Sequence, residues 1–257
     1  MRKELLLSML VLLLLFSSCN QEKAGSEDSI MGVKALLWSQ FSAEAEALYL
    51  QGYNIASRVM KDSADHRHEK PWAVVLDIDE TVLDNSPFDV EKIRAGERYS
   101  EAIWAEWCEM REAIAIPGAL DFIRLAEKLG VEVFYVSNRK DTLLEATLEN
   151  LNELEFPYAD EAHLMLKKES SSKDARREAV SMNYKILLLI GDNLGDFDGI
   201  FDDRTIEYGK PAVREMKEQF GSRFIMLPNP MYGKWERGTF PEGMPEEKEV
   251  LKFLRGY

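Results

Sequence analysis

Two pairs of acidic residues stand directly after apolar segments of this chain. Asp77 and Asp79 follow the segment AVVL, and Asp192 and Asp196 follow KILLLIG. Carboxylates placed this close repel each other unless a cation or a shared proton relieves the charge. One carboxylate could attack an electrophile while its neighbour carries a proton, and both pairs could share a hard divalent ion such as Mg²⁺. The spacing therefore indicates metal-assisted nucleophilic and acid–base chemistry.

Further polar residues stand at similar boundaries. Ser137 and Asn138 follow the apolar segment VEVFYV, where a hydroxyl, an amide and backbone N–H groups could hold phosphate oxygens. Lys173 follows a run of serines at a predicted helix start, where an ammonium group could neutralise a transferring phosphoryl group. Lys167 and Lys168 are alternatives for that role. Each signal alone is weak, but their order along the chain indicates phosphoryl transfer.

The scaffold that must position these residues is a series of apolar strands alternating with helices. We expect strands at 73–78, 131–136, 164–166, 186–190 and 224–227. We expect helices at 30–60 (one helix or a pair), 90–113, 120–129, 142–154, 173–181 and 246–254. Strands that are apolar throughout predict an α/β fold with a parallel sheet covered on both faces. Ligands bind at the carboxyl ends of such strands, and the aromatic-rich segment 90–113 reads as an inserted cap.

The N-terminal segment is a targeting sequence. Its apolar run at 5–16 is too short to span a bilayer, which needs about 20 residues, and it reads as a signal peptide. The sequence LFSSC ending at Cys19 resembles the bacterial lipobox, so we expect residues 1–18 to be removed and Cys19 to be lipidated. Ordinary secretion with cleavage near Ser18 is the alternative. The polar residues 19–29 read as a flexible tether.

The bulk composition limits the partners. The chain has 257 residues, with 32 basic and 46 acidic side chains and a net charge of −14. Such an acidic surface excludes nonspecific binding to nucleic acid. It allows a small phosphorylated substrate, because a bound metal ion can supply local positive charge that outweighs the negative charge of the whole protein. Cys108 is the one cysteine besides Cys19, which excludes an internal disulfide framework in the mature chain.

The strings LDIDETVLDNSPF, VSNR, LKKESSSKDARR and GDNLGDF resemble the motifs of class C acid phosphatases. This family comprises bacterial outer-membrane lipoprotein 5′-nucleotidases within the haloacid dehalogenase-like superfamily. The similarity extends over about residues 36–235. It implies a Rossmannoid parallel-sheet core at 30–257, with a mainly helical cap built from the N-terminal helix and an insertion at about 84–116.

The resemblance also implies the roles of the reacting groups. Asp77 resembles the nucleophile, and Asp79 resembles the general acid that protonates the leaving oxygen and then activates water. The magnesium ligands would be Asp77, the backbone carbonyl of Asp79, and Asp192. Asp196 would support the metal site or Lys173.

Phosphate and base contacts follow from the same resemblance. Ser137 and Asn138 would hold the phosphate, and the family layout favours Lys173 over the two earlier lysines. Trp104 and Tyr232 occupy positions where family members stack the nucleobase; packing within the cap is the alternative. Gly195 departs from the pattern, because many members carry an acidic residue there.

The resemblance therefore implies a magnesium-dependent acid phosphatase, acting on nucleoside 5′-monophosphates or nicotinamide mononucleotide through an aspartyl phosphate. It also implies a lipid-anchored protein of the bacterial envelope, in the outer membrane, and a homodimer. One alternative is a surface lipoprotein that binds a phosphorylated ligand or haem without catalysis; the presence of only three histidines argues against haem. A dehalogenase or a phosphotransferase is the other alternative.

Overall fold

A five-stranded sheet forms the centre of the computed structural model, which describes residues 28–64, 66, 68–240, 242, 245 and 247–256. The strand order is β5-β4-β1-β6-β7, and every neighbouring pair is parallel. The strands are β1 (Trp72–Leu76), β4 (Glu132–Lys140), β5 (Leu164–Lys167), β6 (Lys185–Gly191) and β7 (Phe224–Met226). The predicted α/β class with a parallel sheet is confirmed.

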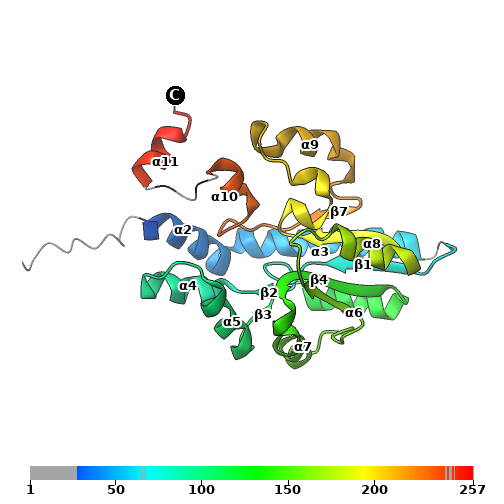
Figure 1. The fold of residues 1–257 in the computed structure, drawn as a ribbon. Coiled ribbons are helices and arrows are strands. Elements are labelled where there is room, and N and C mark those ends of the chain that lie inside the picture. The colour runs from blue at the N-terminus through cyan, green and yellow to red at the C-terminus, as the bar shows by residue number, and fades with distance from the viewer. Residues whose placement is uncertain are drawn as a thin grey trace, which may run out of the picture.

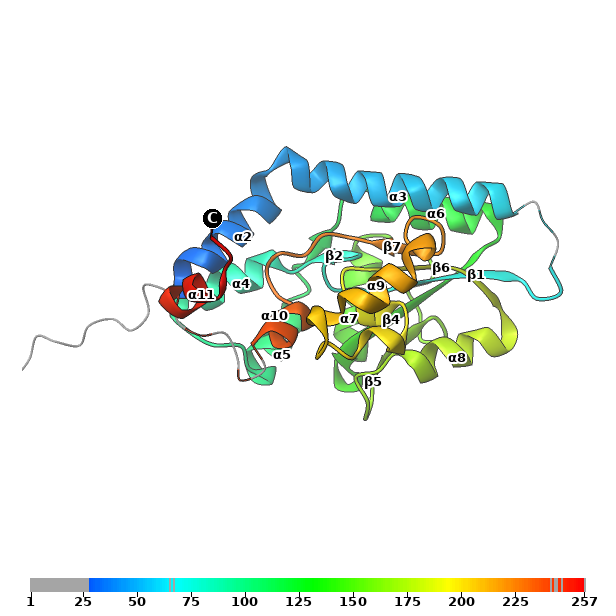
Figure 2. The same ribbon diagram turned by 90° about the horizontal axis from the view of Figure 1, so that it is seen from above.

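Both faces of this sheet are covered, as the apolar strands predicted. Val74 and Leu76 of β1 pack into a core with helices on one face, and Ala73 and Val75 pack into a second core on the other. Figure 2 shows α3 and α6 running along one side of the sheet and α8 along the opposite side. These helices are α3 (Ala43–Ala64), α6 (Ala119–Leu129) and α8 (Asp174–Asn183).

The N-terminal helical segment is a pair of helices, α2 (Asp28–Phe41) and α3, which separate at Ser42. The long helix α3 also fixes loops at the carboxyl edge of the sheet. The hydroxyl of Tyr49 donates to the carbonyl of Pro228 at 3.0 Å, and that of Tyr53 donates to the carbonyl of Thr81 at 2.6 Å. Helix α3 therefore braces the segment after β1 and the segment after β7.

The aromatic-rich segment after β1 differs in detail from the single helical stretch expected at 90–113. It contains α4 (Ser86–Ala95) and α5 (Glu101–Met110), flanked by a short antiparallel pair of β2 (Leu83–Asp84) with β3 (Ile114–Ala115). Gly96 ends α4 in the left-handed conformation, with φ of 66°. Figure 1 shows α4 and α5 at the end of the molecule away from α8, with α4 beside α2. Because a left-handed residue interrupts the chain, the helical pattern cannot continue through Gly96.

The remaining helices are α7 (Leu144–Glu153), α9 (Lys210–Glu215), α10 (Lys234–Thr239) and α11 (Glu247–Phe253). Short 3-10 turns occur at Asp141–Leu143, Leu194–Asp196, Gly199–Phe201, Glu207–Gly209 and Lys217–Gln219. Within the described ranges, no helix combines the length and the apolar character needed to cross a bilayer. Cys19, the signal peptide and the tether lie outside the described residues, except that residues 28 and 29 begin α2.

Candidate active site

The carboxylate of Asp77 stands at the carboxyl end of the central strand β1. The backbone N–H of Asp77 donates to the carbonyl of Ile190 at 2.9 Å, which ties this position to the neighbouring strand β6. Lys173, directly before α8, is only 4% exposed, and its Nζ lies 2.6 Å from Asp77 Oδ1. The same ammonium lies 2.7 Å from Asp196 Oδ1. A buried cation therefore joins the first acidic segment to the second.

This contact distinguishes Lys173 from the two alternative lysines. Lys167 ends the edge strand β5, and Lys168 is exposed just beyond it. Their position at and just beyond the end of the edge strand contrasts with the buried position of Lys173 between two carboxylates. The residue favoured by the sequence resemblance is thus the lysine that the structure places beside Asp77.

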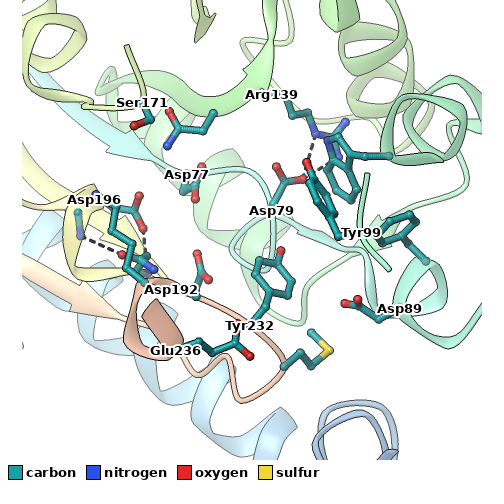
Figure 3. Close-up of a pocket in the computed structure, with 18 of the residues that line it drawn as sticks. Asp77, Asp79, Asp89, Tyr99, Arg139, Ser171, Asp192, Asp196, Tyr232 and Glu236 are labelled. Carbon is teal, nitrogen blue, oxygen red and sulfur yellow. Dashed lines mark hydrogen bonds and ion pairs between the residues drawn. The ribbon is translucent and has the colours of Figure 1, made fainter. Parts of the chain in front are cut away.

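Asp77, Asp192 and Asp196 form a compact carboxylate cluster. One oxygen of each lies within 4.8 Å of the others, and Figure 3 shows the three side chains on the same side of the pocket. A short turn after β6 brings Asp196 back: its carboxylate accepts from the N–H of Asn193 at 2.9 Å. Gly191 makes this approach possible, because a Cβ there would lie 2.3 Å from Asp196 Oδ2.

Electrostatics make this cluster a good fit for a divalent cation. Burial raises the pKa of Asp77 to about 7; Lys173 opposes the shift, whereas Asp196 and Asp79 add to it. Burial, and then the charges of Asp196 and Asp77, raise the pKa of Asp192 well above its usual range. Close, buried, all-oxygen ligands that repel one another are the donor set that a hard divalent ion neutralises.

The side chain of Asp79 is turned away from this cluster. Its Oδ1 lies 2.8 Å from Arg139 Nη2 and also accepts from Arg139 Nε at 3.0 Å and from Asn85 Nδ2 at 3.0 Å. Its Oδ2 accepts from the hydroxyl of Ser137 at 3.3 Å. Asp196, rather than the carboxylate of Asp79, is thus the third side chain of the cluster. Asp79 is held separately, in a fixed direction, as a proton carrier would need to be.

Arg139 is a functional candidate that the sequence analysis did not assign. Its side chain is 1% exposed, and besides Asp79 it contacts Asn85 Oδ1 at 3.3 Å and Thr147 Oγ1 at 3.3 Å. The available signal was its place next to Ser137 and Asn138 in the string VSNR. A buried arginine needs a partner carboxylate, and the sequence alone does not identify that partner.

The two residues predicted to hold phosphate differ in position. Asn138 lines the pocket, and its Oδ1 accepts from Arg176 Nη2 at 2.7 Å. Ser137 is buried, donates its hydroxyl to Asp79, and accepts with the same oxygen from the N–H of Arg139 at 3.1 Å. Asn138 is therefore available to a ligand, whereas the Ser137 hydroxyl supports Asp79.

The carboxylate cluster opens into a pocket of about 540 Å³. This volume falls in the usual range for small-molecule sites. Trp104 of α5 and Tyr232 of the loop after β7 both line the pocket, as do two aromatic residues that the sequence analysis did not name, Phe88 and Tyr99. The rings of Phe88 and Trp104 meet edge to face with centroids 5.1 Å apart. One side of the pocket is therefore acidic and the other is aromatic (Figure 3).

Asn229 links these two sides. Its Nδ2 donates to Asp192 Oδ2 at 2.8 Å, and its Oδ1 accepts from the backbone N–H of Met231 at 2.9 Å and of Tyr232 at 3.4 Å. One amide side chain thus orients a carboxylate of the cluster and shapes the loop that carries Tyr232.

The chain matches known acid phosphatases in sequence and in structure. The family "HAD superfamily, subfamily IIIB (Acid phosphatase)" matches residues 22–235. A structure of the class C acid phosphatase from Bacillus anthracis shares 38% sequence identity with a TM-score of 0.83, covering 89% of this chain and 98% of that chain. A second structure of that enzyme, with tungstate bound, shares 36% identity with a TM-score of 0.82, covering 89% and 99%.

A plant protein gives a more distant match. The stem 31 kDa glycoprotein of Glycine max is 27% identical over 199 residues, which is 75% of this chain and 69% of that protein. The family match, the shared fold and the carboxylate cluster agree with one another, and they favour a hydrolase over a non-catalytic binding protein. The chain belongs to the acid phosphatases of HAD subfamily IIIB and is a phosphomonoester hydrolase.

Proposed function

We propose that this enzyme is a magnesium-dependent acid phosphatase that hydrolyses nucleoside 5′-monophosphates through a phosphorylated Asp77. The observation that carries the proposal is the cluster of Asp77, Asp192 and Asp196, with Lys173 paired to Asp77 and Asp196, facing a pocket with aromatic walls. An all-oxygen ligand set suits Mg²⁺ better than ions that prefer nitrogen or sulfur. The tungstate bound by the Bacillus anthracis enzyme, a tetrahedral oxyanion like phosphate, supports an oxyanion site in the family.

The first step is attack on phosphorus. An Asp77 oxygen forms a bond to phosphorus while the bond from phosphorus to the ester oxygen breaks, and Asp79 donates a proton to that leaving oxygen. Lys173 offsets charge on the phosphoryl group. Asp79 must carry a proton for this step. Asn85 and Arg139 fix the direction of the Asp79 carboxyl group.

The second step regenerates the enzyme. A water molecule attacks phosphorus, Asp79 accepts its proton, and the bond between phosphorus and Asp77 breaks to release inorganic phosphate. Magnesium would be held by Asp77, Asp192 and the carbonyl of Asp79, with Asp196 beside it, and would supply Lewis-acid stabilisation of phosphoryl charge. Asp79 thus serves as acid and then as base, which explains why a second carboxylate accompanies the nucleophile.

The reacting group can be tested directly with p-nitrophenyl phosphate. Asp77→Asn is expected to abolish phosphate release while the far-UV circular dichroism spectrum stays that of the wild type, and EDTA is expected to abolish wild-type turnover until Mg²⁺ is restored. Asp121→Asn, an exposed aspartate at the start of α6, is the matched control. Wild-type turnover by Asp77→Asn would refute the assignment of the nucleophile.

The nucleotide preference rests on the aromatic wall. Trp104 and Tyr232 line the same pocket as Asp77, so a nucleoside attached to the phosphate would lie among aromatic rings. Stacking on such rings contributes about 1–3 kcal/mol per base. Trp104→Ala and Tyr232→Ala are therefore expected to lower kcat/KM for nucleoside monophosphates more than for p-nitrophenyl phosphate. Nucleotide preference that survives both substitutions would refute the stacking role.

The location and assembly proposals rest on sequence resemblance. We expect lipidation at Cys19 to anchor the enzyme in the bacterial envelope, at the outer membrane, and Cys19→Ser should release it and prevent labelling by a fatty acid. The expected homodimer can be tested by light scattering of the form that lacks residues 1–19. A monomer at all concentrations would contradict it.

A further inference from the structure

The guanidinium of Arg176 joins three segments at the carboxyl edge of the sheet and has no role in the proposed reaction. Arg176 is partly buried in the first turn of α8, one helical turn after Lys173. Its Nη1 donates to the carbonyl of Ser137 at 2.5 Å and to that of Met165 at 3.4 Å. These contacts tie the start of α8 to β4 and to the edge strand β5.

The other terminal nitrogen of Arg176 holds groups next to the pocket. Nη2 donates to Asn138 Oδ1 at 2.7 Å and to the carbonyl of Ser172 at 3.2 Å. Asn138 lines the pocket, and so does Ser171, the neighbour of Ser172. Figure 3 shows Ser171 on the Asp77 side of the pocket, opposite Tyr99. The contacts of Arg176 therefore concentrate at the end of the pocket where phosphorus must be attacked.

The contact with Arg176 fixes the direction of the Asn138 amide. A guanidinium donates hydrogen bonds and accepts none, so the end of the amide that faces it must be the oxygen. The Nδ2 group of Asn138 then lies on the other branch of the side chain. Asn138 is exposed, and its Nδ2 has no hydrogen-bond partner among the residues that the structure describes. This N–H₂ group is available to donate to an oxyanion in the pocket.

We propose that Arg176 is a positioning residue for phosphate binding, which holds the Asn138 amide so that Nδ2 donates to a phosphate oxygen of the substrate. Contact with phosphate was expected for Asn138, but no residue was expected to orient its amide. The inference rests on the proposed attack by Asp77, because the phosphate must lie beside that residue. It applies to any phosphomonoester, since the leaving group does not enter it.

A double-mutant cycle between Arg176 and Asn138 tests the inference. The quantities measured are the Ki of inorganic phosphate as a competitive inhibitor and the kcat and KM for p-nitrophenyl phosphate, all in Mg²⁺. Asn138→Ala is expected to raise Ki and KM about tenfold or more, because a hydrogen bond to a charged group is lost. The fall in kcat should be smaller, since substrate and transition state both make this contact.

Arg176→Met should raise Ki by a similar factor, because the amide is then no longer held. In the Asn138→Ala background, Arg176→Met should change Ki by less than about twofold, since its effect acts through the missing amide. A loss of positive charge near the site, or a general disturbance of α8, would instead raise Ki in both backgrounds. The cycle thus separates orientation of Asn138 from these other effects.

Three more variants complete the experiment. Asn138→Asp should raise Ki more than Asn138→Ala, because a carboxylate oxygen would replace Nδ2 and face the phosphate. Arg176→Lys keeps the charge without the paired donors of the guanidinium, so it takes the place of Arg176→Met in the cycle if the methionine variant does not fold. Glu178→Gln, at an exposed residue of the same helix, is the matched control and should keep the wild-type Ki.

The results that would overturn the inference are distinct from failure of the proposed reaction. Additive effects in the cycle, a wild-type Ki for Asn138→Ala or for both Arg176 variants, or an Asn138→Asp variant that inhibits no worse than Asn138→Ala would show that Arg176 does not orient a phosphate donor. In each case Asp77→Asn can still be inactive, and the proposed reaction stands. An active Asp77→Asn variant would remove the reacting group beside which the phosphate was placed, and the inference would fail with it.

Discussion

Replacing Lys173 by methionine should destabilise the protein and stop turnover. The ammonium is 4% exposed and lies within 2.7 Å of a carboxylate oxygen of both Asp77 and Asp196, so its removal leaves two buried carboxylates without their cation. Removing one partner of a buried ion pair costs about 3–5 kcal/mol. Because Lys173 opposes the upward shift in the pKa of Asp77, the variant should also hold a larger fraction of Asp77 in the protonated, non-nucleophilic form.

Urea unfolding in EDTA measures the stability part of this prediction. We expect Lys173→Met to lose about 3–5 kcal/mol of unfolding free energy, and we expect Mg²⁺ to return part of it, because a divalent ion supplies charge to the same carboxylates. Phosphate release should fall about one-hundred- to one-thousandfold. Lys168→Met, at an exposed lysine outside the cluster, is the control. A Lys173→Met protein as stable and as active as the control would refute the central role of this ammonium.

Three further predictions follow from the contacts around the cluster. Burial raises the pKa of Asp77 from 3.8 to about 7. Between pH 4 and 7 the metal-free folded protein therefore holds a proton that the unfolded chain has lost, so urea midpoints measured in EDTA should fall as the pH rises through this range. Mg²⁺ should stabilise the protein most above pH 7. Asn229→Ala should weaken Mg²⁺ activation about tenfold and raise the KM for nucleotides, because Asn229 holds both Asp192 and the Tyr232 loop; unchanged Mg²⁺ titrations would contradict this. Arg139→Lys should lower kcat for p-nitrophenyl phosphate about one-hundredfold, because an ammonium cannot reproduce the paired contacts of the guanidinium with Asp79; a wild-type kcat would show that those contacts are dispensable.

The sequence pattern was sufficient to predict the parallel sheet and to predict that the catalytic residues lie at the carboxyl ends of its strands. β1 and β6 are continuous apolar runs, and the carboxylates of Asp77 and Asp192 stand directly beyond them. Because parallel strands place their carboxyl ends at one edge, these two residues were expected to meet. The cap was less predictable: β2 and β3 have two residues each, which is too short for a periodic signal.

The roles of individual side chains depend on the directions in which those side chains point, and the spacing of residues along the sequence does not define these directions. Asp79 stands two positions from Asp77, yet its carboxylate faces Arg139, whereas Asp196 returns to the cluster through a turn closed by Asn193. Glu80, the residue directly after Asp79, has a positive φ of 54°. Such a φ is rare for a residue other than glycine, and no sequence pattern predicts it here. Local backbone reversals of this kind decide which carboxylates converge.

The most direct test of this account is to trap the phosphorylated enzyme during rapid turnover in Mg²⁺. Acid quenching followed by borohydride reduction converts an aspartyl phosphate into homoserine, which peptide mass spectrometry locates by its mass. The account predicts the conversion at Asp77 and no other aspartate, with none in EDTA. Conversion at a different residue, or steady phosphate release with no modified Asp77, would contradict the claim that this strand-end carboxylate attacks phosphorus.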